Sequence, residues 1–512
     1  MRVPSGPHRK CGADIGGSRF SLGVPEDGPR TGRTWPIRRC GQRGAGPSRA
    51  VAYLRCVPLG TRRRRCAVLA AALAAALAAG CGAGSDARAP DDPSVIRIGL
   101  LSTLEGPFTP LGVAANQGAK LALLEAGGTL TGTGPLDTVT GATVAGKPVE
   151  LTVVGSNSVS PDIAVTAARG LVEESGVDVI VGPTSSDEGL AVKNYMTSAP
   201  DVTLVSGTTG AQNMTLRDPV PNVFRFSPDG AQGTAGLGVY AYKELGARRV
   251  LTVAEDYSLP YDQVGGFLTE FCAAGGTVAQ RLWTPVGTTD FAAYIAPLAQ
   301  DSSIDSVYVA LGGTDAVTFL NQFSDAVGRD VTIIAGNLTV DPAVLGQLDD
   351  RGEGIVSAGP VAALSTPAYR QYAAALKQHY PESAPPGVAD VLYYVAMKAV
   401  LRALADSGGD VSGGQAAFRR ALAAESFDTP QGPVRLDPNR QVIANNYLFT
   451  IRGGKPALLR EVPAVTQTLG RDPAAYTAQA AFDRSNPRCA SERPRTTPAA
   501  RPADTRPVEE DG

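Results

Sequence analysis

Short apolar runs alternate with longer amphipathic stretches along most of the chain. The runs have the length of buried β-strands, and the apolar positions between them recur at helical spacing. Repeated strand–helix units of this kind form parallel sheets with helices on both faces. The predicted strands are 95–101, 149–154, 177–181, 202–206, 249–254, 277–283, 304–311 and 331–335, and the predicted helices are 113–126, 161–175, 187–198, 229–245, 260–274, 289–300 and 314–327.

The alternating region, residues 95–469, is longer than one hydrophobic core usually organises, so it predicts an α/β protein with two lobes. Within it, residues 367–424 are expected to be mainly helical, and 432–452 to supply two short strands. The segment 471–512 is rich in Pro, Arg and acidic residues, which predicts a disordered C-terminal tail.

The N-terminal part has a different pattern. Residues 1–60 are rich in Arg, Gly and Pro and show no periodicity, so we expect no packed structure there. Residues 61–81 contain four consecutive arginines and then the uncharged run 66–80. That run is shorter than the roughly 20 residues of a membrane-spanning helix, and a basic cluster before a short apolar run is typical of a secretory signal peptide.

The end of this apolar run, Leu77-Ala78-Ala79-Gly80-Cys81, resembles a bacterial lipobox. The resemblance implies that Cys81 is lipidated, that residues 82–94 form a flexible tether, and that the lipid holds the protein on a membrane. A plain signal peptide with a coincidental cysteine is the alternative. Since a signal normally begins close to the initiator, translation is expected to start near Val51 or Val57, which makes the earlier residues a mis-assigned extension.

Charge and histidine content narrow the function classes. Residues 1–65 hold 15 Lys and Arg against 3 Asp and Glu, whereas the remainder carries a net charge of −14. An acidic body disfavours nucleic acid as a partner, because phosphate binding needs a basic face. The chain has only two histidines, His8 and His379, which disfavours most zinc sites and most histidine acid–base mechanisms. We therefore expect neither an enzyme nor a bound metal or cofactor.

Three loops after predicted strands are rich in Gly, Ser and Thr. Ligands of doubly wound sheets bind beyond the carboxyl ends of the strands, near helix N-termini. Free amide N–H groups and hydroxyls at such positions suit a carboxylate or another anion. The same residue types also cap helices, so ligand binding and simple capping both stay open. The loops are Gly182–Ser186, Ser206–Gly210 and Gly312–Thr314.

The order of several stretches resembles the leucine/isoleucine/valine-type solute-binding proteins across about residues 95–460. The resemblance implies a type I periplasmic-binding-protein fold, with two Rossmann-like lobes that are joined by three hinge crossovers and close on a small solute. Such a protein delivers its solute to the permease and ATPase subunits of an ABC importer. The matching stretches are Ile96–Leu101, Glu105–Pro107, Leu111-Gly112, Leu171–Pro183, Val223–Pro228, Lys243–Ala247 and Thr289–Phe291.

The resemblance also implies domain boundaries. The first lobe comprises residues 95–226 and 362–440, and the second comprises 227–361 and 441–462. The hinges then fall near residues 226, 361 and 440.

Binding residues follow from the same resemblance. The serine that receives the ligand carboxylate corresponds to Ser186, with Ser185 beside it. The next loop contributes Thr208 and Thr209, although a shift of one residue places Gly210 there. The cleft tyrosine of the second lobe corresponds to Tyr261, but Asp262 follows it where the family has a glycine.

One departure concerns the ligand. Amino-acid binders hold the ligand ammonium with an acidic residue after the strand that matches 331–335, and here Leu338 is nearest to that position. A buried ammonium without a partner is costly, so the ligand is expected to be a small carboxylate or an amino-acid-like or amide solute other than an ordinary branched-chain amino acid. Glu105 and Asp315 are spare carboxylates on nearby loops, and the alternative for both is an ordinary solvated loop charge.

The sequence therefore predicts an exported, lipid-anchored solute-binding subunit on the extracytoplasmic face of the cell membrane. A lipoprotein of the same fold that senses a ligand and signals to a membrane partner is the alternative. An exported hydrolase is a third hypothesis, with His379 as its only available histidine. Cys272 and Cys489 are the cysteines that remain beyond Cys81 after export, and the sequence leaves open whether they pair.

Overall fold

The computed structural model describes residues 93–489, apart from 158–159, 328–329 and 363–365. The described residues all belong to one of two compact units, residues 86–512. The predictions for the extension 1–60, the signal peptide 61–81 with Cys81, and nearly all of the tether 82–94 lie outside the described residues.

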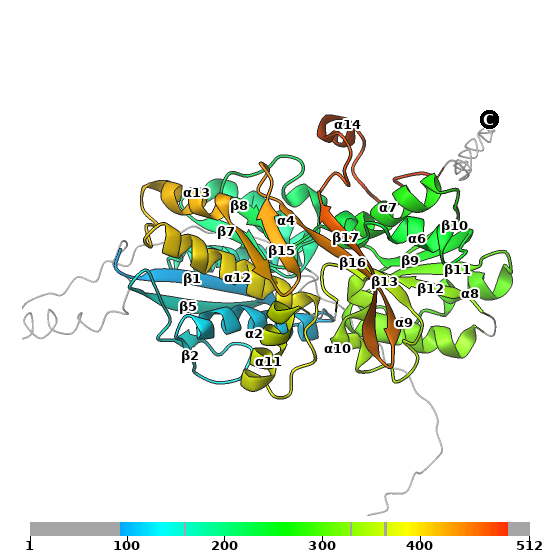
Figure 1. Ribbon diagram of the computed structural model, residues 1–512, viewed down its shortest axis with the longest axis horizontal. Coiled ribbons are helices and arrows are strands. Elements are labelled where there is room, and N and C mark those ends of the chain that lie inside the picture. Colours follow the sequence, from blue (N-terminus) through cyan, green and yellow to red (C-terminus); the bar gives the residue numbers. More distant parts are fainter. Residues whose placement is uncertain (1–92, 158–159, 328–329, 363–365, 490–512) are drawn as a thin grey trace, which may run out of the picture. The chain divides into compact units, whose positions relative to one another are not determined.

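The first lobe is built on a six-stranded sheet, which Figure 1 shows in blue, cyan and green. The central strand β1 is buried at seven of its eight positions, because helices cover both faces of the sheet. All neighbours in this sheet are parallel except β4 and β5. In spatial order the strands are β4 (Thr143–Val144), β5 (Lys147–Ser156), β1 (Ile96–Thr103), β6 (Val179–Val181), β7 (Thr203–Ser206) and β8 (Val223–Arg225).

The second lobe is built on a nine-stranded mixed sheet. Its first five strands are parallel, and antiparallel strands extend it. In spatial order they are β10 (Thr277–Thr284), β9 (Arg249–Glu255), β11 (Ser306–Ala310), β12 (Thr332–Ala335), β13 (Val356–Gly359), β16 (Val442–Arg452), β15 (Gly432–Leu436) and β14 (Ser426–Thr429), with β17 (Lys455–Val465) beside β16. A separate hairpin consists of β2 (Thr129–Leu130) and β3 (Val139–Thr140).

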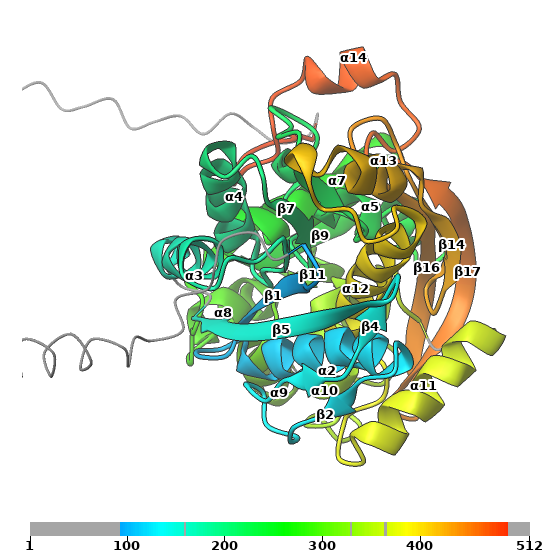
Figure 2. The same ribbon diagram turned by 90° about the vertical axis from the view of Figure 1, so that its left-hand side faces the viewer.

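Helices cover both faces of each sheet, as the two views in Figures 1 and 2 show. On the first lobe, α2 (Thr109–Glu125), α11 (Pro367–His379), α12 (Val388–Asp406) and α13 (Ala416–Ala424) share one core, and α3 (Pro161–Glu173) and α4 (Ser186–Tyr195) share another. On the second lobe, α6 (Leu237–Lys243) and α7 (Ser258–Ala273) share one core, and α8 (Ala292–Gln300), α9 (Gly313–Ala326) and α10 (Pro342–Leu345) share another. Short helices are α5 (Gly230–Gly233), α14 (Pro473–Thr477), η1 (Met196–Ser198), η2 (Gln212–Met214), η3 (Asn337–Val340) and η4 (Gly413–Gln415).

The chain passes between the two sets of cores more than once. Phe226 packs in the first lobe and Leu237 in the second, so one passage follows β8. Strand β16 makes another, because Ala444 lies in a first-lobe core and Tyr447 in a second-lobe core. Val434 of β15 packs in the first lobe, although β15 pairs with β16 of the nine-stranded sheet. This antiparallel region therefore connects the two lobes.

Two local predictions differ from the structure. The predicted helix 229–245 is divided into α5 and α6, because Gly236 adopts a positive φ of 86° between them. The segment 471–489, expected to be disordered, contains α14 and forms a disulfide between Cys489 and Cys272 of α7. Composition missed this order because the anchoring contacts come from distant parts of the chain.

None of the helices within residues 93–489 is both long and apolar enough to cross a membrane.

Candidate functional site

A pocket lies between the two lobes, at the carboxyl ends of strands from both sheets. From the first lobe, Phe108 follows β1, Ser185 follows β6, and Thr208 follows β7. From the second lobe, Tyr257 follows β9 and Asn337 follows β12. This is where open α/β sheets bind ligands, because helix N-termini and free loop backbone converge there. Further lining residues are Leu111, Thr184, Gly210, Pro228, Asp229, Gly230, Gly233, Leu259, Gln263, Leu338, Pro360, Val388, Ala389 and Leu392.

Most of the pocket wall is apolar. The rings of Phe108 and Tyr257 come from opposite lobes and are tilted by 50°, with 5.8 Å between their centroids. Leu111 extends this wall on the first lobe and Leu338 on the second. A ligand with an apolar body gains free energy here from burial, at about 25 cal/mol for each Å² of apolar surface removed from water.

The pocket lining also contains hydrogen-bonding groups from both lobes. Ser185 is the N-cap residue of α4, and its hydroxyl makes no capping bond to that helix. The first N–H groups of a helix have no partner within the helix, and they carry partial positive charge. From the second lobe, the Asn337 side-chain oxygen accepts from the Gln263 amide nitrogen at 2.8 Å, which orients the Asn337 amide at the pocket. Donors from both lobes therefore reach the same pocket.

Asp229 is the only acidic side chain that lines the pocket within the described residues, and its carboxylate already has partners. One oxygen accepts from the Gln232 amide at 2.8 Å, and the other lies 3.7 Å from the Arg225 guanidinium. Burial raises the pKa of the Asp229 carboxyl, while the Arg225 charge opposes that rise. Burial in turn lowers the pKa of Arg225 to about 10, so it stays protonated at neutral pH.

Glu255 lies behind the pocket, hydrogen-bonded to Tyr257. It is fully buried, and its carboxylate accepts from the Gly312 amide at 3.1 Å. Burial raises the pKa of Glu255 well above its ordinary value, with the nearby Asp315 carboxylate adding to the rise. The pKa of the Tyr257 hydroxyl is also raised well above its ordinary value, first by burial and then by Glu255. The Glu255 carboxylate is thus already hydrogen-bonded, and it does not line the pocket.

The structure separates the binding residues that the sequence suggested for the first lobe. Ser185 and Thr208 line the pocket, and the Thr208 hydroxyl donates to the Thr184 carbonyl at 2.9 Å. Ser186 and Thr209 are buried behind the pocket lining. The Ser186 hydroxyl accepts from the Gly210 amide at 2.9 Å, and the Thr209 hydroxyl donates to the Pro183 carbonyl at 3.2 Å. In this conformation both tie the two binding loops to each other.

The other suggested residues do not line the pocket. The Tyr261 hydroxyl donates to Asp256, and its ring packs edge-on against Trp283. Glu105 is exposed to solvent. Asp315 is buried and accepts from the amides of Gly287 and Thr288, which orders their loop in the second lobe.

Tyr257 and Asn337 are the main pocket residues that sequence reasoning missed. Asn337 follows the carboxyl end of β12, so the rule that selected the Ser and Thr loops would also have selected it. Tyr257 lies one helical turn before Tyr261, and the family resemblance had pointed to Tyr261 as the cleft tyrosine.

Backbone amides at the starts of two helices also connect the lobes. The Ser258 amide of α7 donates to Asp187 of α4 at 3.2 Å. Across another part of the interface, the Val388 amide at the start of α12 donates to Asp341 of the second lobe at 2.9 Å. Each bond joins a helix N-terminus of one lobe to a carboxylate of the other, so both depend on the present approach of the lobes.

Comparison with known proteins shows which family this chain belongs to. The sequence profile of the periplasmic binding protein family matches residues 95–455, so the chain belongs to this family. Its two lobes with an intervening pocket are the type I fold of ABC-transporter solute-binding proteins, as the resemblance implied. A curated relative is the Leu/Ile/Val-binding protein homolog 6 of Brucella melitensis, 23% identical over 360 residues, which cover 69% of this chain and 87% of that protein.

Solved structures agree with this class. An ABC transporter substrate-binding protein from Sphaerobacter thermophilus has a TM-score of 0.63 and 30% identity, covering 72% of this chain and 98% of that one. A solute-binding protein from R. palustris, solved with benzoate, has a TM-score of 0.66 and 24% identity, covering 72% and 97%. The second likeness is evidence for the fold alone.

Proposed function

We propose that this protein is the extracytoplasmic solute-binding subunit of an ABC importer, and that its ligand is a small monocarboxylate with an apolar or aromatic body and no ammonium group. This ligand class is inferred from one observation: the described pocket lining contains no free carboxylate. Its one acidic residue, Asp229, is paired with Arg225 and hydrogen-bonded to the Gln232 amide. A buried ammonium would have no charged partner there.

The remaining pocket groups support the same class. The ligand carboxylate is placed against Ser185 and the start of α4, where a hydroxyl and helix N–H groups donate. The apolar body packs against the Phe108 and Tyr257 rings, which line the pocket from opposite lobes. Asp187 also lies in the first turn of α4, but its carboxylate accepts from Ser258 across the interface. The role in this proposal is binding and release, with no bond made or broken in the solute.

Benzoate and leucine test the ligand class by isothermal titration calorimetry. We expect benzoate to bind at least about tenfold more tightly than leucine, because tenfold needs only about 1.4 kcal/mol and an unpaired buried ammonium costs more. Leucine binding as tight as benzoate would reject the ligand class, since the pocket would then satisfy an ammonium. If neither benzoate nor leucine bound, an aromatic carboxylate would be rejected as the ligand.

A pair of variants locates the carboxylate. Ser185→Ala is expected to weaken benzoate binding about tenfold or more, because a hydrogen bond to a charged group contributes about 1.5–3 kcal/mol. Ser186→Ala is the matched variant, because its hydroxyl accepts from Gly210 in the structure. A larger loss with Ser186→Ala would assign the contact to Ser186, as the family resemblance suggested.

We also propose that lipid on Cys81 anchors the protein to the membrane, with mature protein starting at that residue. Intact-mass spectrometry of the membrane-extracted protein should then show a lipid-modified chain beginning at Cys81. Cys81→Ala should move the protein from the membrane fraction into the soluble fraction, because one flexible tether is the only attachment in this proposal. Peptides from residues 1–45 in the precursor would contradict the proposed start near Val51 or Val57.

A further inference from the structure

Residues 466–489, here called the C-terminal strap, follow β17 and lie beyond residue 455, where the match to the family ends. The strap includes α14, which lies at one edge of the molecule in Figures 1 and 2. It makes hydrogen bonds to both lobes, and a disulfide joins its far end to α7. This segment therefore extends the family fold with a separate connection between the lobes.

The first-lobe contacts of the strap are on the loop between β7 and β8. The Gln467 side chain donates to the Gln212 carbonyl at 3.0 Å, and the Gln212 side chain donates to the Tyr476 hydroxyl at 3.1 Å. The Arg217 guanidinium donates to the Gln479 carbonyl at 2.8 Å. This loop belongs firmly to the first lobe, because Met214 packs in a first-lobe core.

The loop that the strap holds also reaches the pocket. It begins with the pocket-lining residues Thr208 and Gly210, and the Gln212 amide donates to Asp262 of α7 at 2.7 Å. Gln212 therefore contacts the second lobe directly through its amide and indirectly through the strap. The strap therefore contacts a loop that also lines the pocket.

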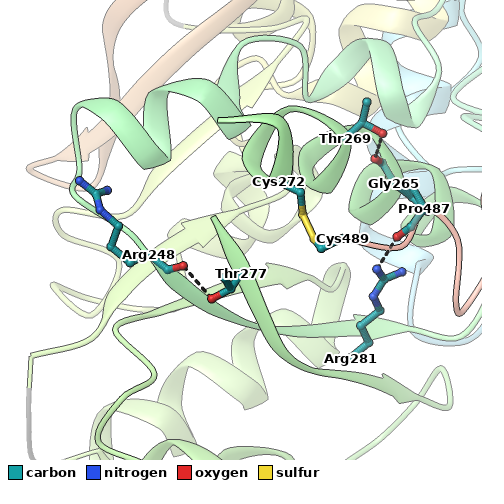
Figure 3. The surroundings of a disulfide bond; sticks show 8 residues. All are labelled: Arg248, Gly265, Thr269, Cys272, Thr277, Arg281, Pro487 and Cys489. Carbon is teal, nitrogen blue, oxygen red and sulfur yellow. Dashed lines mark hydrogen bonds between the residues drawn. A yellow bond between two sulfur atoms is a disulfide. The ribbon is translucent and has the colours of Figure 1, made fainter. Parts of the chain in front are cut away.

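The second-lobe contacts lie at both ends of the strap. It starts at the end of β17, in the nine-stranded sheet. At its other end, Arg484 pairs with Asp256, and the Trp283 indole N–H donates to the Arg484 carbonyl at 3.2 Å. Figure 3 shows the Cys272–Cys489 disulfide on α7, with Arg281 bonded to the Pro487 carbonyl nearby.

We propose that the strap is a closure element, fastened by the Cys272–Cys489 disulfide, that holds the lobes together and positions the 208–217 loop. It begins and ends on the second lobe and holds a first-lobe loop between these points, so the lobes separate only when its first-lobe bonds break. Without the disulfide, the far end depends on the packing of Phe482 against Gly265 of α7, on the bonds of Arg281 and Trp283, and on the pair of Arg484 with Asp256. The Arg484 side chain is exposed, and exposed pairs contribute little.

Reduction of the disulfide releases the strap. A dithiol attacks the S–S bond through a mixed disulfide, transfers two electrons and two protons, and leaves thiols on Cys272 and Cys489 while forming its own disulfide. The freed end then allows the lobes to separate more often, and a bound solute leaves faster. This consequence rests on the proposed function, and it makes solute retention depend on the redox state outside the cytoplasm.

Hydrogen–deuterium exchange tests this proposal without any ligand, so its outcome is independent of the proposed solute. The Ser258 and Val388 amides report lobe contact, because both donate across the interface and neither touches the strap. After treatment of the whole protein with dithiothreitol, we expect exchange in the peptides that contain these amides to rise about tenfold, because the free energy of local opening falls. Exchange in β1 of the first-lobe core should stay unchanged.

Variants separate closure from local anchoring. Cys272→Ser/Cys489→Ser should reproduce the effect of the reductant, and Arg217→Ala should change exchange in the same direction with the disulfide intact. Arg460→Ala is the matched control, because Arg460 pairs with Glu244 within the second lobe. If exchange rises only in residues 466–489 and 212–217 while Ser258 and Val388 stay protected, the strap anchors its own segment and the closure proposal fails.

Discussion

Arg225→Leu is expected to lower the free energy of unfolding by about 3–5 kcal/mol, because it leaves a buried charge without its partner. Arg225 is fully buried at the end of β8 and lies 3.7 Å from Asp229. Its guanidinium also donates to the Thr209 carbonyl at 3.1 Å and to the Thr215 hydroxyl at 3.2 Å. Each of these acceptors loses its donor when leucine replaces arginine.

The same change is expected to impair binding, because Arg225 holds the backbone of a binding loop. It also bonds to Gln441, which immediately precedes β16. Urea denaturation measures the stability effect, and calorimetry with benzoate measures the binding effect. Arg169→Leu is the matched control, since its side chain is exposed, pairs with Glu173 of the same helix at 3.8 Å and lies 5.7 Å from the centroid of the Tyr195 ring. If Arg225→Leu matched this control in stability, the buried network would not be the stabilising element described here.

Gly118→Ala is the second change with a large expected effect. A Cβ atom on Gly118 of α2 would lie 1.9 Å from the Asp390 carbonyl oxygen of α12, and that backbone atom has no flexible side chain to move. The two helices must therefore separate, at a cost at or above the upper end of the usual 1–3 kcal/mol, roughly 3 kcal/mol, for overpacking. The first turns of α12 supply Val388, Ala389 and Leu392 to the pocket, so benzoate binding should weaken as well.

Gly170→Ala is the control for Gly118→Ala. Gly170 lies in α3, and outside the adjoining residues and backbone of that helix no heavy atom would lie within 4 Å of its added Cβ atom. Alanine is favoured over glycine in a helix by about 0.8–1.0 kcal/mol, so this variant should be as stable as the original protein or more stable. Thermal unfolding of both variants measures the difference. Equal stability of the two would show that α2 and α12 have room to adjust.

Much of the fold could be predicted from the sequence because its elements are locally encoded. Strand β1 is an apolar run that can be recognised without knowing which sheet it joins. The helical spacing of residues 314–327 likewise predicted α9, which spans Gly313–Ala326. The break between α5 and α6 escaped prediction, because it depends on the backbone conformation of Gly236 within a continuous helical pattern.

The candidate site could be predicted only in part. The position of Ser185 after β6 and of Thr208 after β7 follows from the rule for ligand sites in doubly wound sheets. The sequence could not separate Ser185 from Ser186, because adjacent residues at a helix start point in different directions. The same limit applies to Tyr257 and Tyr261, since the docking of the lobes decides which side of α7 faces the pocket.

The sequence by itself determined the alternation of strands and helices, the two-lobed α/β class and two of the loops that line the pocket, because these depend on periodicity and residue type along short stretches. Only the tertiary structure decided that Asp229 is occupied by Arg225 and that Asn337 and Tyr257 face the first lobe. It also decided that Cys272 meets Cys489, 217 residues further along the chain. These contacts arise when distant segments pack together, and local pattern carries no information about that packing.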